Sequence, residues 1–279
     1  MMKKPAFFPL LSISGGVICF VLRTLQNRYG FETDTGLPIS GSIHGYLLPA
    51  ALLILAVAAF LLCLRLPSEK GNASLPFSAQ FRTANPLPLM LVIGGIFLWC
   101  LSGIADLLPA FLSRGEWYTA TASGLYYPVS DTARRVSTIL SLLIIPSALC
   151  LFPIAVAARR GEDNRLIGNS LLFPVVYLIL RLTVSYREMS INASQQTYYV
   201  ELLAFILLIL SLYRLSSFAF RCGNTRRFVL YTTPAITLCI TAIADVSSFG
   251  DLLFFCGSTA MLLGFLMMRL TALHAESVG

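Results

Sequence analysis

The sequence predicts an all-α integral membrane protein, a single polytopic domain (residues 1–279) built as a bundle of about eight transmembrane helices. Composition is the first reason, because 57% of the 279 residues are hydrophobic and only 12% are charged. A soluble domain carries about 25% charged residues, so this chain has too little polar surface to cover a globule in water. The other two reasons are a succession of long apolar segments and the basic residues at their ends.

Each predicted helix is an apolar run of about 20 residues, the length needed to cross the hydrocarbon core of a bilayer. The last two runs are separated only by the short hinge S-S-F-G-D at 247–251. A seven-span interpretation would fuse or drop one of them, but together they are too long for one helix, so eight spans are favoured. The eight predicted segments are 7–25, 44–66, 87–111, 135–158, 169–188, 197–220, 228–247 and 251–271.

The orientation follows from the Lys and Arg residues in alternate connections. Twelve of the 20 basic residues fall on the side that holds both termini and six on the other, while Arg181 and Arg214 lie within segments. Basic residues collect on the cytoplasmic side, so both termini are predicted to be cytoplasmic, in the cell membrane. The run Gly30–Pro38, G-F-E-T-D-T-G-L-P, then lies in the first outside loop, where Asp34-Thr35-Gly36 is typical of a turn.

Several functional classes are disfavoured. The net charge of +7 is spread over the ends of apolar runs, which indicates membrane topology and not a nucleic-acid partner. The seven cysteines form no C-x-x-C pair, and His44 and His274 are predicted on opposite sides of the membrane, so no metal site is expected. No phosphate-binding or dinucleotide-binding glycine motif occurs, and no cofactor is predicted.

Ionisable residues within or next to the segments are predicted to lie in the outer half of the membrane. Four of them are candidates for a ligand site or an ion-pair network: Arg181, Asp106, Glu201 and Asp245. Arg181 is deep enough to need a partner, and the three acids are the candidates. Simple solvation at helix ends is preferred for Arg187, Glu188 and Asp251. A structural ion pair and a ligand site are equally compatible with the pattern.

Helical spacing adds a polar stripe. Thr233, Thr237, Thr241 and Asp245 recur every four residues and therefore share one face. Ser102 and Asp106 share a face of the segment 87–111 in the same way. These faces predict an outward-open polar pocket, with Thr233, Thr237, Thr241 and Ser102 lining the route inward. The structural alternative is that the hydroxyls bond to the backbone or join helices together.

Three functions are compatible with this pattern. The leading hypothesis is a non-enzymatic permease, or permease subunit, for a small polar or anionic solute or a lipid headgroup. The second is a sensor or accessory partner of another membrane protein. The third is an intramembrane aspartyl hydrolase, because S-F-G-D at 248–251 resembles the G-x-G-D motif of that class and of prepilin peptidases, with Asp245 or Asp106 as the second aspartate.

The segment F-E-T-D-T-G-L at 31–37 is similar to one that follows the first helix in uncharacterised multi-pass bacterial membrane proteins. The resemblance implies a bacterial cytoplasmic membrane and carries no function with it.

Overall fold

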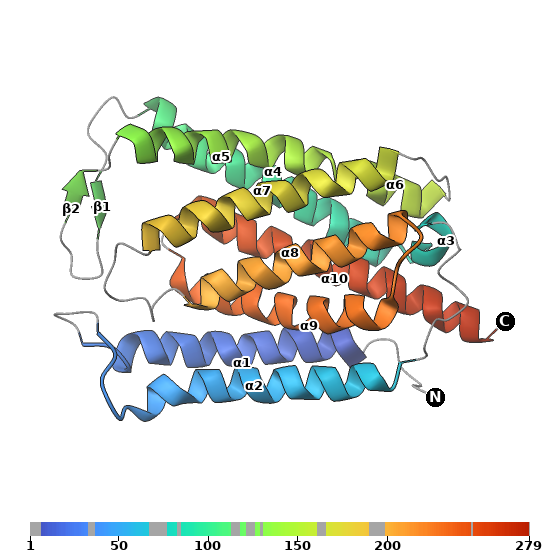
Figure 1. Ribbon diagram of the computed structural model, residues 1–279, viewed down its shortest axis with the longest axis horizontal. Helices are drawn as coiled ribbons and strands as arrows, with labels where there is room; N and C mark the ends of the chain where they lie inside the picture. Colours follow the sequence, from blue (N-terminus) through green and yellow to red (C-terminus); the bar gives the residue numbers. More distant parts are fainter. Residues whose placement is uncertain are drawn as a thin grey trace.

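The computed structural model is a helical bundle in which eight helices are long and apolar enough to cross a membrane, counted over the residues that it describes (Figure 1). Those residues are 7–32, 37–66, 77–82, 85–112, 118–120, 126–128, 131–160, 166–189, 199–246 and 248–278. Helix α1 begins and α10 ends at the same end of the bundle, as an even number of crossings requires. The all-α class and the multi-pass architecture predicted from the sequence are confirmed.

The helices follow the predicted apolar segments closely. Their bounds are α1 Phe7–Tyr29, α2 Ile43–Leu64, α3 Phe77–Phe81, α4 Pro86–Leu112, α5 Asp131–Leu149, α6 Phe152–Arg160, α7 Leu166–Met189, α8 Tyr199–Ala219, α9 Thr225–Ala242 and α10 Phe249–Val278. A short 3-10 helix, η3 (Ile243–Asp245), continues α9, and a two-stranded hairpin pairs β1 (Tyr118–Ala120) with β2 (Tyr126–Pro128). The D-T-G turn at 34–36 lies outside the described residues, although Phe31 and Pro38 on either side of it form an antiparallel bridge.

Two features depart from the predicted segments. The fourth apolar run is divided at Cys150–Leu151 into α5 and α6, between Pro146 and Pro153, residues that lack the backbone N–H that a continuous helix needs. The short helix α3 was not predicted. Its Phe81 is fully buried and its ring packs edge-on against those of Phe218, Phe228 and Phe265.

Helices α4 and α10 make the most extensive interface in the bundle. Glycine permits it, because a Cβ placed on Gly95 of α4 would lie 2.6 Å from the carbonyl oxygen of Gly257 on α10. A Cβ on Gly257 would in turn lie 2.9 Å from the carbonyl oxygen of Gly95. Small residues at such positions let helix backbones approach closely in a membrane, where dispersion contacts hold helices together.

Helix α2 lies at the edge of the bundle, beside α1 (Figure 1). It packs on α1 and α9, and most of its large side chains face outward. Between α2 and α8 the structure contains a groove, described below, that α9 closes from behind. We call the end of the bundle where α9 turns into α10 the hinge end, and the end where α1 begins the terminal end.

Candidate functional site

The first polar cluster lies at the hinge end and joins α1 to η3. The Arg23 Nε donates to both carboxylate oxygens of Asp245, at 2.8 and 2.9 Å. Asn27, one turn further along α1, donates to the same carboxylate at 2.7 Å. The Arg23 side chain is fully buried and that of Asp245 is 9% exposed. This is a buried, charge-assisted pair whose partners neutralise each other.

The same arginine positions the residues at the edge of the groove. Arg23 Nη1 donates to Gln26 Oε1 at 2.8 Å, and the Tyr199 hydroxyl donates to that oxygen at 3.5 Å. The Gln26 amide donates to the carbonyl oxygen of Gly45 on α2, at 3.4 Å. That carbonyl has lost its helical donor, because the residue four positions on is Pro49. A hydrogen-bond chain therefore runs from the ion pair to α2 and α8.

The second polar cluster joins α4, α7 and α10. Arg181 donates to the carboxylate of Asp251 and also, at 3.1 Å, to the Tyr177 hydroxyl. Its guanidinium lies 4.2 Å from the centre of the Phe254 ring, within cation–π range. The Asp251 side chain is 33% exposed, so this pair is more open than the pair between Arg23 and Asp245.

Asp106 belongs to this second cluster. Its carboxylate accepts a hydrogen bond from Ser248 at 3.0 Å and interacts electrostatically with Arg181 and Asp251. The carboxylate lies directly over Gly250, where an added Cβ would clash with it. Only glycine at 250 leaves room for that approach.

These contacts revise the prediction for the charged residues. The preference for simple solvation of Asp251 is wrong, because Asp251 is the ion-pair partner of Arg181. Asp245 is not that partner; it faces α1 on the other side of the hinge. Glu201 lies partly buried in the first turn of α8. The predicted single recess is therefore divided: Asp245 lies in the first cluster, and Arg181 and Asp106 lie in the second.

Arg23 is the main residue that sequence reasoning missed. It lies near the end of the predicted segment 7–25 and was counted among the six basic residues of the outer side, whereas α1 continues to Tyr29 and buries it. A signal was present, since Arg23, Gln26 and Asn27 are spaced three and four residues apart and share one helical face. Reading that polar face would have predicted a buried partner.

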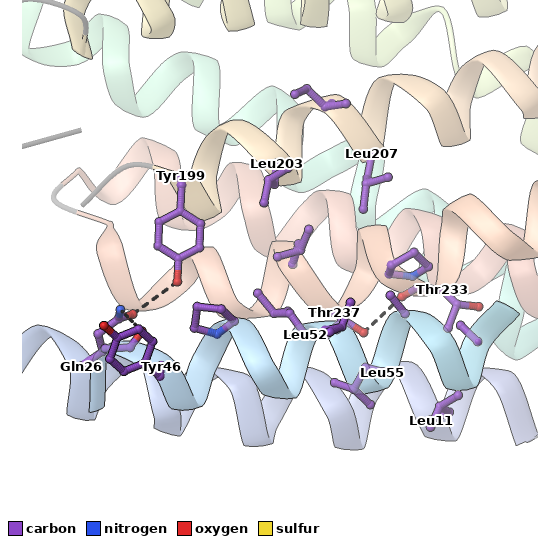
Figure 2. Close-up of a pocket in the computed structure, with 18 residues that line it drawn as sticks. Leu11, Gln26, Tyr46, Leu52, Leu55, Tyr199, Leu203, Leu207, Thr233 and Thr237 are labelled. Carbon is purple, nitrogen blue, oxygen red and sulfur yellow. Dashed lines mark hydrogen bonds between the residues drawn. The ribbon is translucent and has the colours of Figure 1, made fainter. Parts of the chain in front are cut away.

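A groove between α2 and α8 is a cavity, among the described residues, that could take a ligand (Figure 2). Its volume is about 780 Å³. Most of the lining is aliphatic, and several lining residues are exposed, including Leu53 (67%) and Ile206 (40%), so the groove opens on the side of the bundle. The lining residues come from α1, α2, α8 and α9, and none of them is charged.

The polar lining is confined to a few points. Gln26, Tyr46 and Tyr199 gather near one end, and Thr233 and Thr237 lie further along, as Figure 2 shows. Thr237 donates to the carbonyl oxygens of Ser12 and Thr233, at 3.3 and 3.2 Å, which is the structural role considered for the threonine stripe. Thr241 donates to the Thr237 carbonyl oxygen at 2.8 Å and does not line the groove. Ser102 is fully buried in α4, also away from the groove, and its hydroxyl has no hydrogen-bond partner among the described residues.

Across the described part of the chain, no three His, Cys, Asp or Glu side chains cluster as metal ligands would. No protein-family model, curated protein or solved structure matches this chain. The fold and the groove define the class: a polytopic α-helical membrane protein whose cavity is apolar and opens on the side of the bundle.

Proposed function

We propose that this protein binds an uncharged amphiphilic lipid in the α2–α8 groove and serves as a permease, or a permease subunit, for such a molecule. The observation that carries the proposal is a long apolar groove with hydrogen-bonding side chains near one end. An amphiphile matches that pattern, since its chain needs an aliphatic wall and its head needs donors and acceptors. The volume of about 780 Å³ is typical of a small-molecule site.

The length of the groove also favours a chain-like ligand. Gln26 and Leu11 both line it and are 15 residues apart on α1, a rise of about 22 Å. One leaflet contributes roughly 15 Å of hydrocarbon, half of a core of about 30 Å. A chain whose head rests beside Gln26 and Tyr199 would reach past the bilayer midplane. In the orientation expected from the basic residues, that head would enter from the outer leaflet.

A small polar or anionic solute receives less support than a lipid. Arg181 and Arg23 are each bonded to a carboxylate, and the groove offers no charged side chain to an ion. Burying a charge in such a lining without a partner is costly. The lipid form of the permease hypothesis therefore fits the cavity, and the small-ion form does not.

The aspartyl hydrolase alternative gains one supporting contact and one opposing contact. Ser248, the first residue of S-F-G-D, donates to Asp106, which brings that acid close to Asp251. Aspartyl hydrolases, however, need two carboxylates that share a proton, and Asp251 is already bonded to Arg181. We regard a structural role for this cluster as the better-supported one.

Filling the groove tests the proposal. Ala56 lines the groove, whereas Ala50 lies on α2 outside it. In Ala56→Phe the new ring would occupy the space of the lipid chain, and Ala50→Phe is the matched control. The measurement is equilibrium binding of tritiated oleyl alcohol to the purified protein in dodecyl maltoside, corrected with empty micelles. We expect Ala56→Phe to weaken binding at least tenfold and Ala50→Phe to leave it unchanged. Equal affinities in the two variants would refute the proposal.

A further inference from the structure

Thr233 is the polar lining residue that the fold leaves unpaired. Its side chain is 3% exposed, it lines the groove, and its hydroxyl has no hydrogen-bond partner among the described residues. Buried hydroxyls are nearly always bonded, and an exception calls for a physical explanation. The neighbouring Thr237 bonds to backbone carbonyls, so threonines on this face can satisfy themselves, and Thr233 does not.

Pro234 leaves a backbone acceptor unused nearby in α9. A proline has no N–H, so the carbonyl of Leu230, four residues earlier in α9, lacks its usual helical donor. On α2 the equivalent gap left by Pro49 is filled by Gln26, which donates to Gly45. The Thr233 hydroxyl, three residues after Leu230, does not fill the gap on α9. The Thr233 hydroxyl therefore lines the groove as an unused donor, about one helical turn from a carbonyl that Pro234 leaves without its helical donor.

The depth of Thr233 in the membrane limits which chemical groups of a ligand can bind there. Thr233 is the ninth residue of the 21-residue span Thr225–Asp245, so it lies near the middle of the membrane, about 18 Å from Asp245 along the helix. A charged group is strongly disfavoured at that depth. A hydroxyl or an ester carbonyl has the hydrogen-bonding capacity to meet Thr233 without a charge.

We infer that Thr233 binds the hydroxyl group of an uncharged long-chain lipid, of the alcohol or acylglycerol class, near the middle of the membrane. The inference rests on the proposed function and deepens it by naming the ligand class. The head of such a lipid then has two binding points in one groove: Gln26 with Tyr199 near the hinge end, and Thr233 at mid-depth. Two such points along one groove give a permease a path for the head to move from one depth to another.

A pair of ligands isolates the hydroxyl. Oleyl alcohol and cis-9-octadecene share an 18-carbon chain of the same unsaturation and differ in the hydroxyl, so their affinities are compared by competition against tritiated oleyl alcohol in dodecyl maltoside. Thr233→Val removes the hydroxyl and keeps the shape of the side chain. We expect it to weaken oleyl alcohol binding about fivefold, the value of one net hydrogen bond, and to leave octadecene binding unchanged.

Thr232 provides the control. Its hydroxyl is also buried and without a partner among the described residues, but it does not line the groove. Thr232→Val should therefore change the affinity for neither ligand. Thr233→Ser keeps a hydroxyl and should retain oleyl alcohol affinity within about twofold, which separates a binding role from a general loss of folding.

The outcomes separate the two proposals. The role of Thr233 is overturned, while the groove proposal stands, if Thr233→Val leaves the affinity for oleyl alcohol unchanged or lowers the affinity for both ligands equally. It is also overturned if Thr233→Ser or Thr232→Val lowers the affinity for oleyl alcohol as much as Thr233→Val does. If neither ligand binds the wild-type protein, or if Ala56→Phe binds as well as Ala50→Phe, the groove proposal itself fails.

Discussion

The α4–α10 interface is closed by glycines that bring two backbones together, whereas α2 and α8 leave a groove between them. Across the first interface Trp99 donates to Ser258 at 2.9 Å. At the groove, Thr233 has a hydroxyl with no partner among the described residues. The contrast separates a stabilising half of the bundle from a half with room and hydrogen-bonding capacity for a ligand. Substitutions at an ion pair, at two leucines and at two glycines can break or sharpen it.

The largest effect is expected at the ion pair that fixes α1 to η3. Asp245→Asn removes the carboxylate charge to which the fully buried Arg23 is paired, and removing one partner of a buried pair costs about 3–5 kcal/mol. Thermal unfolding in detergent should show the largest loss of stability of the variants described here. Asp251→Asn should cost less, because the Asp251 side chain is 33% exposed and its pair is partly screened by solvent.

A double variant checks the reason for that loss. Arg23→Met combined with Asp245→Leu removes both charges and fills similar space, so it should recover part of the stability lost in Asp245→Asn. A double variant less stable than Asp245→Asn would mean that the pair contributes more than mutual neutralisation.

The next effect compares one leucine from each half. Leu266 of α10 is fully buried, and Leu53 of α2 is 67% exposed in the groove wall. Leu266→Ala should destabilise the fold by about 2–5 kcal/mol because it leaves a cavity. Leu53→Ala should change stability by less than about 0.5 kcal/mol, the usual limit for exposed positions. Equal losses in thermal unfolding would show that the α2 side is packed as tightly as the α4–α10 side.

The smallest effect is expected at the glycine contact. Gly95→Val adds a branched side chain where a Cβ alone would lie 2.6 Å from the Gly257 carbonyl oxygen. The two helices must separate, at a cost of about 1–3 kcal/mol. Gly94, beside it, has open space at its Cβ position, so Gly94→Val is the matched control and should lose less stability in the same unfolding measurement. Two equal losses would assign the effect to helix propensity and not to the interface.

The spans could be predicted because each one is a local property. Twenty apolar residues cross a bilayer whatever their neighbours are, and the hydrocarbon forces their backbone into a helix. The length of an apolar run does not predict the break between α5 and α6, although the prolines at 146 and 153 indicated it. Apolar length also did not predict α3, whose five residues are held in place by packing against other helices.

The candidate site was predicted only in part. Periodicity identified Asp106, Arg181, Asp245 and the threonines as polar positions facing other helices, because the face of a residue depends only on its own helix. It did not say which helix lies opposite. Asp251 was therefore assigned to solvent although it bonds to Arg181, and Arg23 was counted among the basic residues of the outer side although it bonds to Asp245.

By itself, the sequence determined that this chain is a multi-pass helical membrane protein and which positions on the predicted helices are polar. The tertiary structure decided that the acids on the two sides of the α9–α10 hinge bond to different helices, and that the cavity lies between α2 and α8. The physical reason is distance along the chain. Insertion depends on runs of about 20 residues, whereas the partners of both ion pairs are separated by far more of the chain and meet only when helices pack.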